Sequence, residues 1–241
     1  MKLQVIATGS RGNCYVLDDG YRQLILECGV SIKTIKKATN FGFSCVDGCL
    51  VTHSHKDHCK AVKELCEAGI DVYTSAGTAQ EIGVSSHRII EVRELFRAGN
   101  WQITPFDVIH DTVEPFGYAI EDVVGRTRAV FLTDSAYSPY VFNDLDFLMV
   151  ECNHDYESLS DSVSSGYIAV KQQMRVMRNH FSLENCIEFI RVNQARSDRL
   201  RKIVLLHASD TNADTGKMVS EIQGETGIVT ELAVAGKEIE L

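Results

Sequence analysis

The stretch that decides the fold is Gly48-Cys49-Leu50-Val51-Thr52-His53-Ser54-His55-Lys56-Asp57-His58. Its first half is typical of a buried strand, and its second half places four possible metal ligands, His53, His55, Asp57 and His58, within six residues. Imidazole and carboxylate groups are ligands that zinc and manganese accept. Packing is a poor explanation for four such side chains at this spacing. The stretch therefore predicts a strand whose C-terminal loop holds divalent ions, and metal-dependent hydrolysis is the leading hypothesis.

The chain has 241 residues, of which 44% are hydrophobic. This is enough to bury a substantial core, and a single domain over residues 1–241 is expected. No apolar run of about 18 residues or more occurs, and the N-terminal residues pass into a strand pattern, so neither a membrane span nor a signal peptide is expected. None of the eight cysteines forms a C-x-x-C pair. Reduced, mostly buried thiols and a cytoplasmic location are therefore expected.

The net charge of −9 argues against a general polyanion binder, because most of the surface would repel phosphate. The charge is uneven, however. Eight basic and three acidic residues between Gly166 and Lys202 give that segment a charge of +5, which leaves −14 for the rest. Two interpretations stay open for this segment: a solvated helical face, or a track for a nucleic-acid backbone.

Short apolar runs alternate with turn residues and brief helices, a pattern that indicates an α/β sandwich of stacked sheets with flanking helices. Strands are expected at 3–8, 14–18, 24–28, 49–52, 72–74, 88–92, 102–110, 116–121, 129–133, 147–151, 203–207 and 228–234. Apolar residues at helical spacing predict helices at 31–39, 57–68, 167–178, 182–193 and 217–223.

Three further ligand candidates follow apolar runs: His110 after 103–109, Asp134 after 129–133 and His207 after 203–206. Strands of one sheet system would deliver all three to a common edge. Two divalent ions roughly 3.5–4 Å apart can hold a hydroxide between them and stabilise both oxygens of a phosphoryl displacement. Asp134 is the expected bridging carboxylate. His87 has no comparable setting and is expected at the surface.

With these motifs the chain resembles the metallo-β-lactamase superfamily. The order of the motifs looks closer to phosphodiesterase members such as RNase Z than to true β-lactamases, which use a cysteine where Asp134 stands. The resemblance implies a four-layer αββα sandwich and two divalent ions, zinc or manganese. It implies His53, His55 and His110 as ligands of one ion, Asp57, His58 and His207 as ligands of the other, and Asp134 as the bridge. Asp57 would also orient the nucleophilic water.

Finer motifs narrow the resemblance to the YycJ/WalJ-type group of metallo-hydrolases, which implies exonuclease activity on DNA. They are Thr8-Gly9-Ser10-Arg11-Gly12-Asn13-Cys14, Glu151-Cys152-Asn153-His154-Asp155, Asn179-His180-Phe181-Ser182 and His207-Ala208-Ser209-Asp210-Thr211-Asn212. Two departures concern substrate handling. The stretch 156–166 is polar and serine-rich where a proline-bearing connection is expected, and the glycine usual before His180 is absent.

Two more histidines are candidate catalytic residues. His180 precedes Ser182, the expected N-cap of a helix, and would contact the scissile phosphate or protonate the leaving oxygen. His154 lies between Asn153 and Asp155, which would orient it. For both histidines, simple packing is the alternative.

Candidate substrate contacts are more loosely defined. Ser10 and Asn13 belong to a glycine-rich turn that suits either a phosphate nest or an ordinary turn. Asn153 is a further candidate, and Lys171 and Arg175 would contact phosphate from the basic segment. Tyr156, Tyr167 and Phe181 would either stack on unpaired bases or belong to the core.

The sequence as a whole predicts a dinuclear metal-dependent phosphodiesterase that acts on nucleic acid, with DNA exonuclease as the favoured subtype. Three alternatives stay open: hydrolysis of a small phosphodiester, glyoxalase II-like hydrolysis of a thioester, and a metal-stabilised nucleic-acid-binding scaffold without turnover. No membrane partner is expected, and the sequence does not indicate an oligomeric state.

Overall fold

The computed structural model describes residues 1–40, 42–209 and 211–241, and Asp210 of the last quoted motif lies outside them. The chain divides into two compact units. Unit 1 comprises Met1–Asp107, Thr112–Thr127 and Val234–Leu241, and unit 2 comprises Val108–Asp111 and Arg128–Ala233. The expected single domain over the whole chain stays a prediction.

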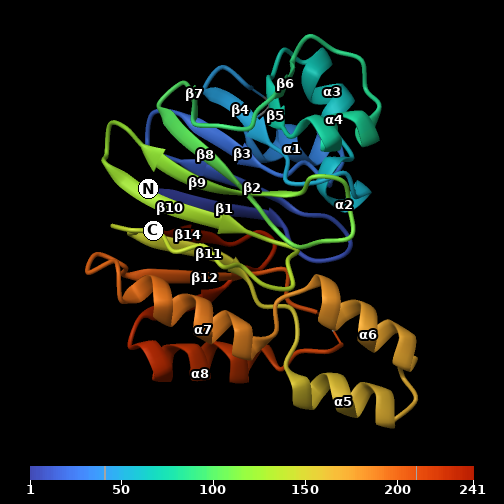
Figure 1. Cartoon of the computed structure of the whole chain (residues 1–241). Helices are drawn as coiled ribbons and strands as arrows, with labels where there is room; N and C mark the ends of the chain where they lie inside the picture. Colours follow the sequence, from blue (N-terminus) through green and yellow to red (C-terminus); the bar gives the residue numbers. More distant parts are fainter. Residues whose placement is uncertain (41, 210) are drawn as a thin grey trace. The chain divides into compact units, whose positions relative to one another are not determined.

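A seven-stranded mixed sheet forms the centre of unit 1 (Figure 1). Its first four strands pair antiparallel, and the remaining pairs, from β3 onwards, are parallel. In spatial order the strands are β14 (Glu238–Glu240), β1 (Lys2–Ala7), β2 (Cys14–Asp18), β3 (Gln23–Leu26), β4 (Val46–Leu50), β5 (Val72–Thr74) and β6 (Ile89–Glu91).

Unit 1 also contains an antiparallel ladder of β7 (Phe96–Ala98), β8 (Trp101–Asp107) and β9 (Phe116–Asp122). Its helices are α1 (Ile32–Ala38), α2 (Lys56–Cys59), α3 (Val62–Glu67) and α4 (Ala76–Ile82). Aliphatic side chains and five cysteine thiols form a core in this unit. All eight cysteines of the chain are free, and all but Cys45 are buried, as predicted.

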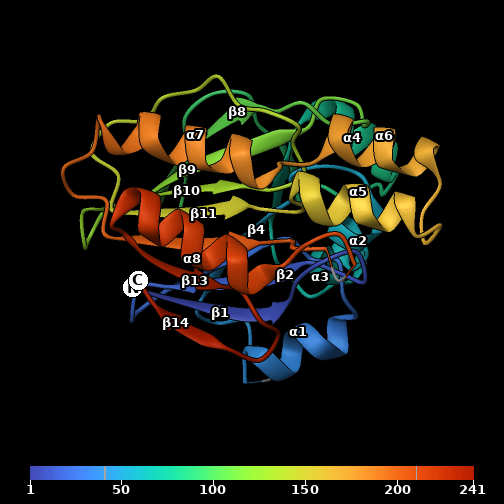
Figure 2. The ribbon, with the colours of Figure 1, turned by 90° about the horizontal axis from the view of Figure 1, so that it is seen from below.

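Unit 2 is built on a parallel ladder of β10 (Thr127–Leu132), β11 (Phe147–Glu151), β12 (Lys202–Leu206) and β13 (Val229–Leu232). The middle two strands are almost entirely buried, as is usual for parallel strands covered on both faces. The helices are α5 (Tyr156–Ser164), α6 (Val170–Asn179), α7 (Leu183–Gln194) and α8 (Thr215–Thr226). Helices α7 and α8 lie side by side against the ladder, and α5 and α6 form a second pair (Figures 1 and 2).

Sheets flanked by helices confirm the predicted fold class, with local differences. The helix expected at 57–68 is interrupted, because Ala61 leaves helical geometry and donates its backbone N–H to the Cys28 carbonyl. The stretch 156–166, expected as a polar connection, contains helix α5, which Asp155 caps by accepting from the Ser158 N–H. Helix α4 and the short strands β7 and β14 were not predicted. Within the described ranges, no helix has the length and apolar character to cross a bilayer.

Candidate metal centre

In unit 1, the predicted ligands gather on the loop that follows β4. His53 Nε2 and His55 Nδ1 are 3.2 Å apart, and the His53 and His58 ring centroids are 4.1 Å apart. His58 Nε2 is 3.6 Å from an Asp57 carboxylate oxygen. His53 and His58 are buried, whereas Asp57 is partly accessible. Three imidazoles and one carboxylate are thus brought together in unit 1.

The orientation of these rings is set by polar groups behind them. Thr52 Oγ1 lies 2.8 Å from His53 Nδ1, and the buried Glu27 carboxylate lies 3.6 Å from His58 Nδ1. Glu27 also accepts from the Thr52 backbone N–H. The Thr52 hydroxyl on the far ring nitrogen can hold the His53 imidazole in one orientation and leave its other nitrogen for a metal, whereas the Glu27 carboxylate stands beyond hydrogen-bond distance of His58 Nδ1.

Gly29 lets two loops approach closely beneath these ligands. A Cβ atom at Gly29 would lie 1.6 Å from the Asp57 carbonyl oxygen, a separation that no side chain tolerates. The approach is stabilised by backbone hydrogen bonds, from the Asn13 N–H to the Asp57 carbonyl at 2.7 Å and from the Cys28 N–H to the His58 carbonyl at 2.8 Å. Only glycine fits at position 29 without moving the ligand loop.

In unit 2, Asp134 lies between two histidines. Its Oδ2 is 3.8 Å from His110 Nε2, and its Oδ1 is 3.7 Å from His207 Nε2. All three side chains are at least nine-tenths buried. The carboxylate thus turns one oxygen to each ring, which is the arrangement that a bridging ligand requires.

These separations fit metal ligands better than hydrogen bonds. At 3.7–3.8 Å the pairs are too far apart to be hydrogen-bonded. Two ligands of one tetrahedral ion, each at about 2.0–2.1 Å from it, lie roughly 3.3 Å from each other. The far nitrogen of each ring is held, since His110 Nδ1 contacts the Asn179 carbonyl at 3.1 Å and His207 Nδ1 contacts Glu151 at 3.3 Å. The donors of unit 2 therefore suit a divalent ion.

Backbone strain marks the same positions. Asp134 has φ of +47° and His207 has φ of +49°, and Glu27 in unit 1 has φ of +64°. Left-handed geometry is costly for residues other than glycine, and it persists where function demands a particular side-chain direction. Each of these residues directly follows a strand or lies two residues beyond one. The left-handed backbone geometry at the strand ends thus directs these side chains towards the candidate ligands.

Glu151 is a functional candidate that sequence reasoning missed. It is fully buried at the carboxyl end of β11, and its carboxylate contacts His180 Nδ1 at 2.7 Å and His207 Nδ1 at 3.3 Å. It also accepts from the backbone N–H groups of Ser135 and Phe181. Burial alone would raise the pKa of Glu151, but the charge and hydrogen bond of His180 and the hydrogen bond of His207 lower it to about 2. Glu151 therefore remains ionised and holds both rings.

His180 lies beside the ligands of unit 2. Its ring is stacked on that of His207, with centroids 5.5 Å apart and planes 8° apart, and it lies 5.6 Å from the His110 ring. Ligand atoms of Asp134, Glu151, His180 and His207 all lie within 4.8 Å of one another. Ser182 is the N-cap of α7, as predicted. His180 is thus held in a fixed position next to two metal-ligand candidates.

His154 is buried, and within the described part of the chain neither of its ring nitrogens has a hydrogen-bond partner. Its backbone carbonyl accepts from the Leu183 N–H, which joins it to the start of α7. Burial lowers the pKa of His154 to about 4, so the folded protein holds a neutral imidazole at pH 7. Its predicted catalytic role stays a prediction.

The lowered pKa of His154 predicts a loss of stability in mild acid. The unfolded chain takes up a proton near pH 6.5, while the folded chain does so only near pH 4. The free energy of unfolding should therefore fall between these values, by at most about 3 kcal/mol from this group. His154→Leu should flatten that dependence in urea unfolding at pH 7, 5.5 and 4.5. The control is His87→Leu on the exposed surface, which should keep the wild-type slope, and an unchanged slope in His154→Leu would contradict the assignment.

The predicted substrate contacts differ in accessibility. Ser10, Lys171 and Arg175 are exposed, whereas Asn13 and Asn153 are buried. The Asn13 amide lies 3.0 Å from His58 Nε2, and Asn153 Nδ2 lies 3.1 Å from His207 Nδ1. Both asparagines therefore contact candidate ligands, and their assignment to substrate stays a prediction.

The aromatic side chains considered for base stacking also differ. Phe181 is fully buried, whereas Tyr156 and Tyr167 are exposed. Phe181 is therefore a core residue, and the two tyrosines keep their faces accessible.

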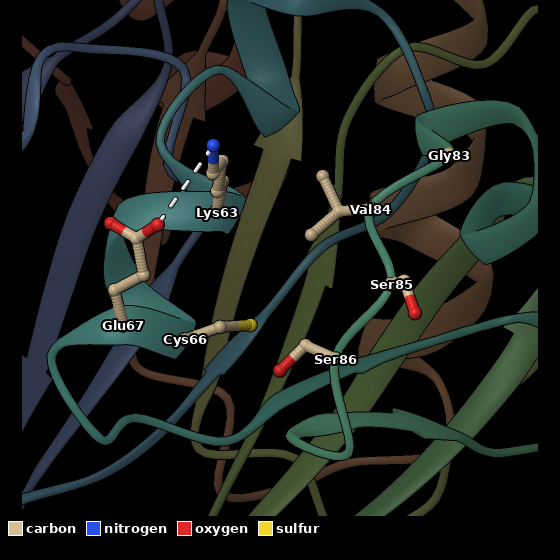
Figure 3. Close-up of a pocket in the computed structure, with 7 residues that line it drawn as sticks. All are labelled: Lys63, Cys66, Glu67, Gly83, Val84, Ser85 and Ser86. Carbon is tan, nitrogen blue, oxygen red and sulfur yellow. Dashed lines mark ion pairs between the residues drawn. The ribbon is translucent and has the colours of Figure 1, made fainter.

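A separate pocket of about 350 Å³ in unit 1 contains none of the predicted ligands (Figure 3). It lies between α3 and the segment after α4 and is lined by Lys63, Cys66, Glu67, Gly83, Val84, Ser85 and Ser86. Lys63 and Glu67 pair with each other at 3.9 Å, and burial raises the pKa of the Cys66 thiol. This pocket therefore offers no reactive thiolate and no unpaired charge.

Candidate histidine and carboxylate ligands at strand ends, in a fold of sheets flanked by helices, are typical of the class of metal-dependent hydrolases. The chain belongs to the β-lactamase superfamily, because the model of the beta-lactamase superfamily domain matches residues 23–208. Solved structures confirm the predicted metallo-β-lactamase fold. YhfI from Bacillus subtilis superimposes with a TM-score of 0.76 at 19% identity over 99% of both chains. The short form of human tRNase Z does so with a TM-score of 0.67 at 15% identity, over 100% of this chain and 99% of the other.

Two curated relatives carry exonuclease names. Exodeoxyribonuclease WalJ of Streptococcus pneumoniae is 29% identical over 230 residues, which cover 88% of this chain and 82% of the relative. Exodeoxyribonuclease YycJ of Bacillus anthracis is 28% identical over 174 residues, which cover 66% of this chain and 65% of the relative. The predicted resemblance to this group is thereby confirmed.

Proposed function

We propose that the protein is an exonuclease that hydrolyses phosphodiester bonds of DNA with two divalent ions, zinc or manganese. The ligands would be His53, His55, Asp57, His58, His110, Asp134 and His207. The observation that carries the proposal is the carboxylate of Asp134, which directs its two oxygens at two different imidazoles. The exonuclease names of the relatives, at 28–29% identity, support DNA as the substrate.

Each candidate residue has a role in this proposal. Bound ions would lower the pKa of water and stabilise the negative charge that develops on phosphate oxygens. Asp57, which is partly accessible, would orient the attacking water and accept its proton. His180 would give a proton to the leaving oxygen, and the buried Glu151 would hold its ring for that transfer.

Metal removal provides the direct test. A chelator should abolish hydrolysis of an end-labelled single-stranded oligonucleotide, and added zinc or manganese should restore it. Elemental analysis of the purified, metal-loaded protein should give two ions per chain. His53→Ala and His207→Ala, one variant in each unit, should each lose metal and lower kcat/KM by about 10²-fold or more. The exposed His87→Ala is the control and should keep both, whereas full activity in chelated protein would contradict the proposal.

The acidic net charge keeps a smaller substrate in consideration as the second candidate. Labelled single-stranded and duplex DNA, bis(p-nitrophenyl) phosphate and a thioester of the glyoxalase II kind should be compared in one assay. DNA is expected to be the best substrate. Turnover of the thioester alone would overturn the phosphodiesterase proposal. DNA binding without turnover across zinc, manganese and magnesium would instead support a scaffold.

A further inference from the structure

Helix α6 carries two neighbouring exposed faces. Lys171, Arg175 and Arg178 follow one another at spacings of four and three residues and therefore share a face. Val170, Met174 and Met177 share the adjoining face and are 60%, 48% and 46% exposed. A helix whose only role is to pack against its domain buries its apolar face. A basic face and an apolar face that are both exposed to solvent are therefore unusual for such a helix.

In the structure, the cations of the basic segment 166–202 fall into two groups, those on α6 and those that follow it. Four of the five cations that follow α6 in this segment are engaged within unit 2: Arg191 pairs with Glu225, Arg199 with Asp146 and Lys202 with Glu231, and Arg201 lies over the Phe147 ring. On α6, in contrast, neither Lys171 nor Arg178 has an ion pair with any described residue. Arg175 contacts the partly exposed Asp111 at 3.4 Å. Within this segment, the cations without an ion pair or ring contact to a described residue are therefore Lys171 and Arg178 on α6 and the exposed Arg196 beyond α7.

The cations of α6 line a groove that begins beside a candidate metal ligand. The groove measures about 660 Å³ and is bounded by α6 and Asp111. At the C-terminal end of α6, the Asn179 carbonyl contacts His110 Nδ1 at 3.1 Å. Asp111 lies 3.4 Å from His110 Nε2 on one side and contacts Arg175 on the other. The basic face thus leads away from His110 within unit 2.

Resting on the phosphodiesterase function proposed above, we propose that α6 binds the phosphates of a single polynucleotide strand beyond the bond that is cleaved. The three cations span about two helical turns, roughly 10 Å, which suits two or three successive phosphates of a flexible strand. Val170, Met174 and Met177 offer the bases an adaptable apolar surface beside them. The helix would therefore make the enzyme prefer a polymer over a small phosphodiester.

Charge complementarity selects this occupant over a second copy of the chain. The residues outside 166–202 carry a net charge of −14, so an approaching polyanion is repelled except near this segment. Two copies packed through their α6 faces would instead bring the unpaired cations of both helices close together, which is unfavourable.

The test compares the triple variant Lys171→Gln/Arg175→Gln/Arg178→Gln with the wild type. Substrates are a single-stranded oligonucleotide and bis(p-nitrophenyl) phosphate, which has no neighbouring phosphate. The loss of kcat/KM on the oligonucleotide should exceed any loss on the small ester by at least about tenfold. Each neutralised phosphate contributes about −0.7 to the slope of log affinity against log salt. The variant's slope should therefore be shallower by about 2, so that the wild type loses about 20-fold more affinity between 50 and 200 mM salt.

A matched control removes three exposed lysines from another helix, as Lys33→Gln/Lys36→Gln/Lys37→Gln on α1. It changes the net charge equally and should keep the wild-type ratio of the two activities and the wild-type salt slope. Equal slopes for the α6 variant and the wild type would overturn the role of α6 while leaving the phosphodiesterase proposal intact. Absence of hydrolysis of both substrates by metal-loaded wild type would count against the proposed function itself. A dimer that Met174→Gln/Met177→Gln dissociates without any effect on DNA would assign α6 to self-association and overturn the proposal.

Discussion

Replacing Asp134 by asparagine is expected to lower kcat/KM by about 10³-fold or more and to reduce the bound metal from two ions per chain. The two carboxylate oxygens face His110 Nε2 and His207 Nε2, and the amide would turn its NH2 group towards one of these positions. That group cannot bind a cation, and the shared negative charge is lost. Asparagine tolerates left-handed backbone geometry as aspartate does, so the φ of +47° should be kept.

The matched control is Asp144→Asn, because Asp144 also belongs to unit 2 and has a positive φ of +56°. Its side chain is exposed and contacts Arg128 at 3.4 Å, away from any candidate ligand. Kinetics, metal content and thermal unfolding should be measured on both variants. Asp144→Asn is expected to match the wild type. An Asp134→Asn protein with wild-type turnover and metal content would remove the bridging role.

The candidate ligands could be predicted from the sequence because residues with metal-binding side chains stand directly after predicted strands. His53 follows an apolar run in unit 1, and Asp134 and His207 follow apolar runs in unit 2, where parallel strands place their carboxyl ends at one edge of a sheet. The structure brings Asp134 and His207 together on this principle in unit 2. The two-residue spacing of His53 and His55 likewise brings their nitrogens to 3.2 Å in unit 1.

Glu151 shows what this reasoning overlooked. It ends the apolar run Phe147–Glu151, and the register pairs it with Leu206, directly before His207. A carboxylate at the end of a strand beside two ligand-bearing strand ends was a usable signal. The sequence does not indicate which side chains meet this carboxylate, whereas the structure places it against His180 and His207.

Predictions from the local sequence pattern were also wrong where tertiary contacts determine the backbone conformation. The apolar stripe of 57–68 has helical spacing throughout, yet the bond between the Ala61 N–H and Cys28 breaks it into α2 and α3. Helix α5 was not predicted because it is rich in serine, and serine side chains disfavour helices by competing for the hydrogen-bonding groups of the backbone. In the structure, the hydroxyls of Ser162 and Ser164 bond back to carbonyls four residues earlier, inside the helix.

Replacing Gly29 by alanine is the second change with a large expected effect, although Gly29 itself binds no metal in the proposed scheme. The new Cβ would lie 1.6 Å from the Asp57 carbonyl oxygen and 2.8 Å from the His58 backbone nitrogen, so the ligand loop must move. Backbone atoms cannot relieve this clash by a change of rotamer. We expect a loss of about 2–3 kcal/mol of stability or more. Displacing Asp57 and His58 by about 1 Å should lower kcat/KM by about 10²-fold.

The control for Gly29→Ala is Gly224→Ala, which makes the same chemical change within helix α8. A Cβ at Gly224 meets no atom within 4 Å, so alanine should raise the free energy of unfolding by about 0.5–1 kcal/mol through its helix preference. Opposite signs of the two stability changes, with metal loss only in Gly29→Ala, would show that close approach at the ligand loop causes the defect. If Gly29→Ala kept the wild-type metal content and melting temperature, the ligand loop would tolerate displacement. A fixed backbone at Asp57 and His58 would then not be required for the proposed site.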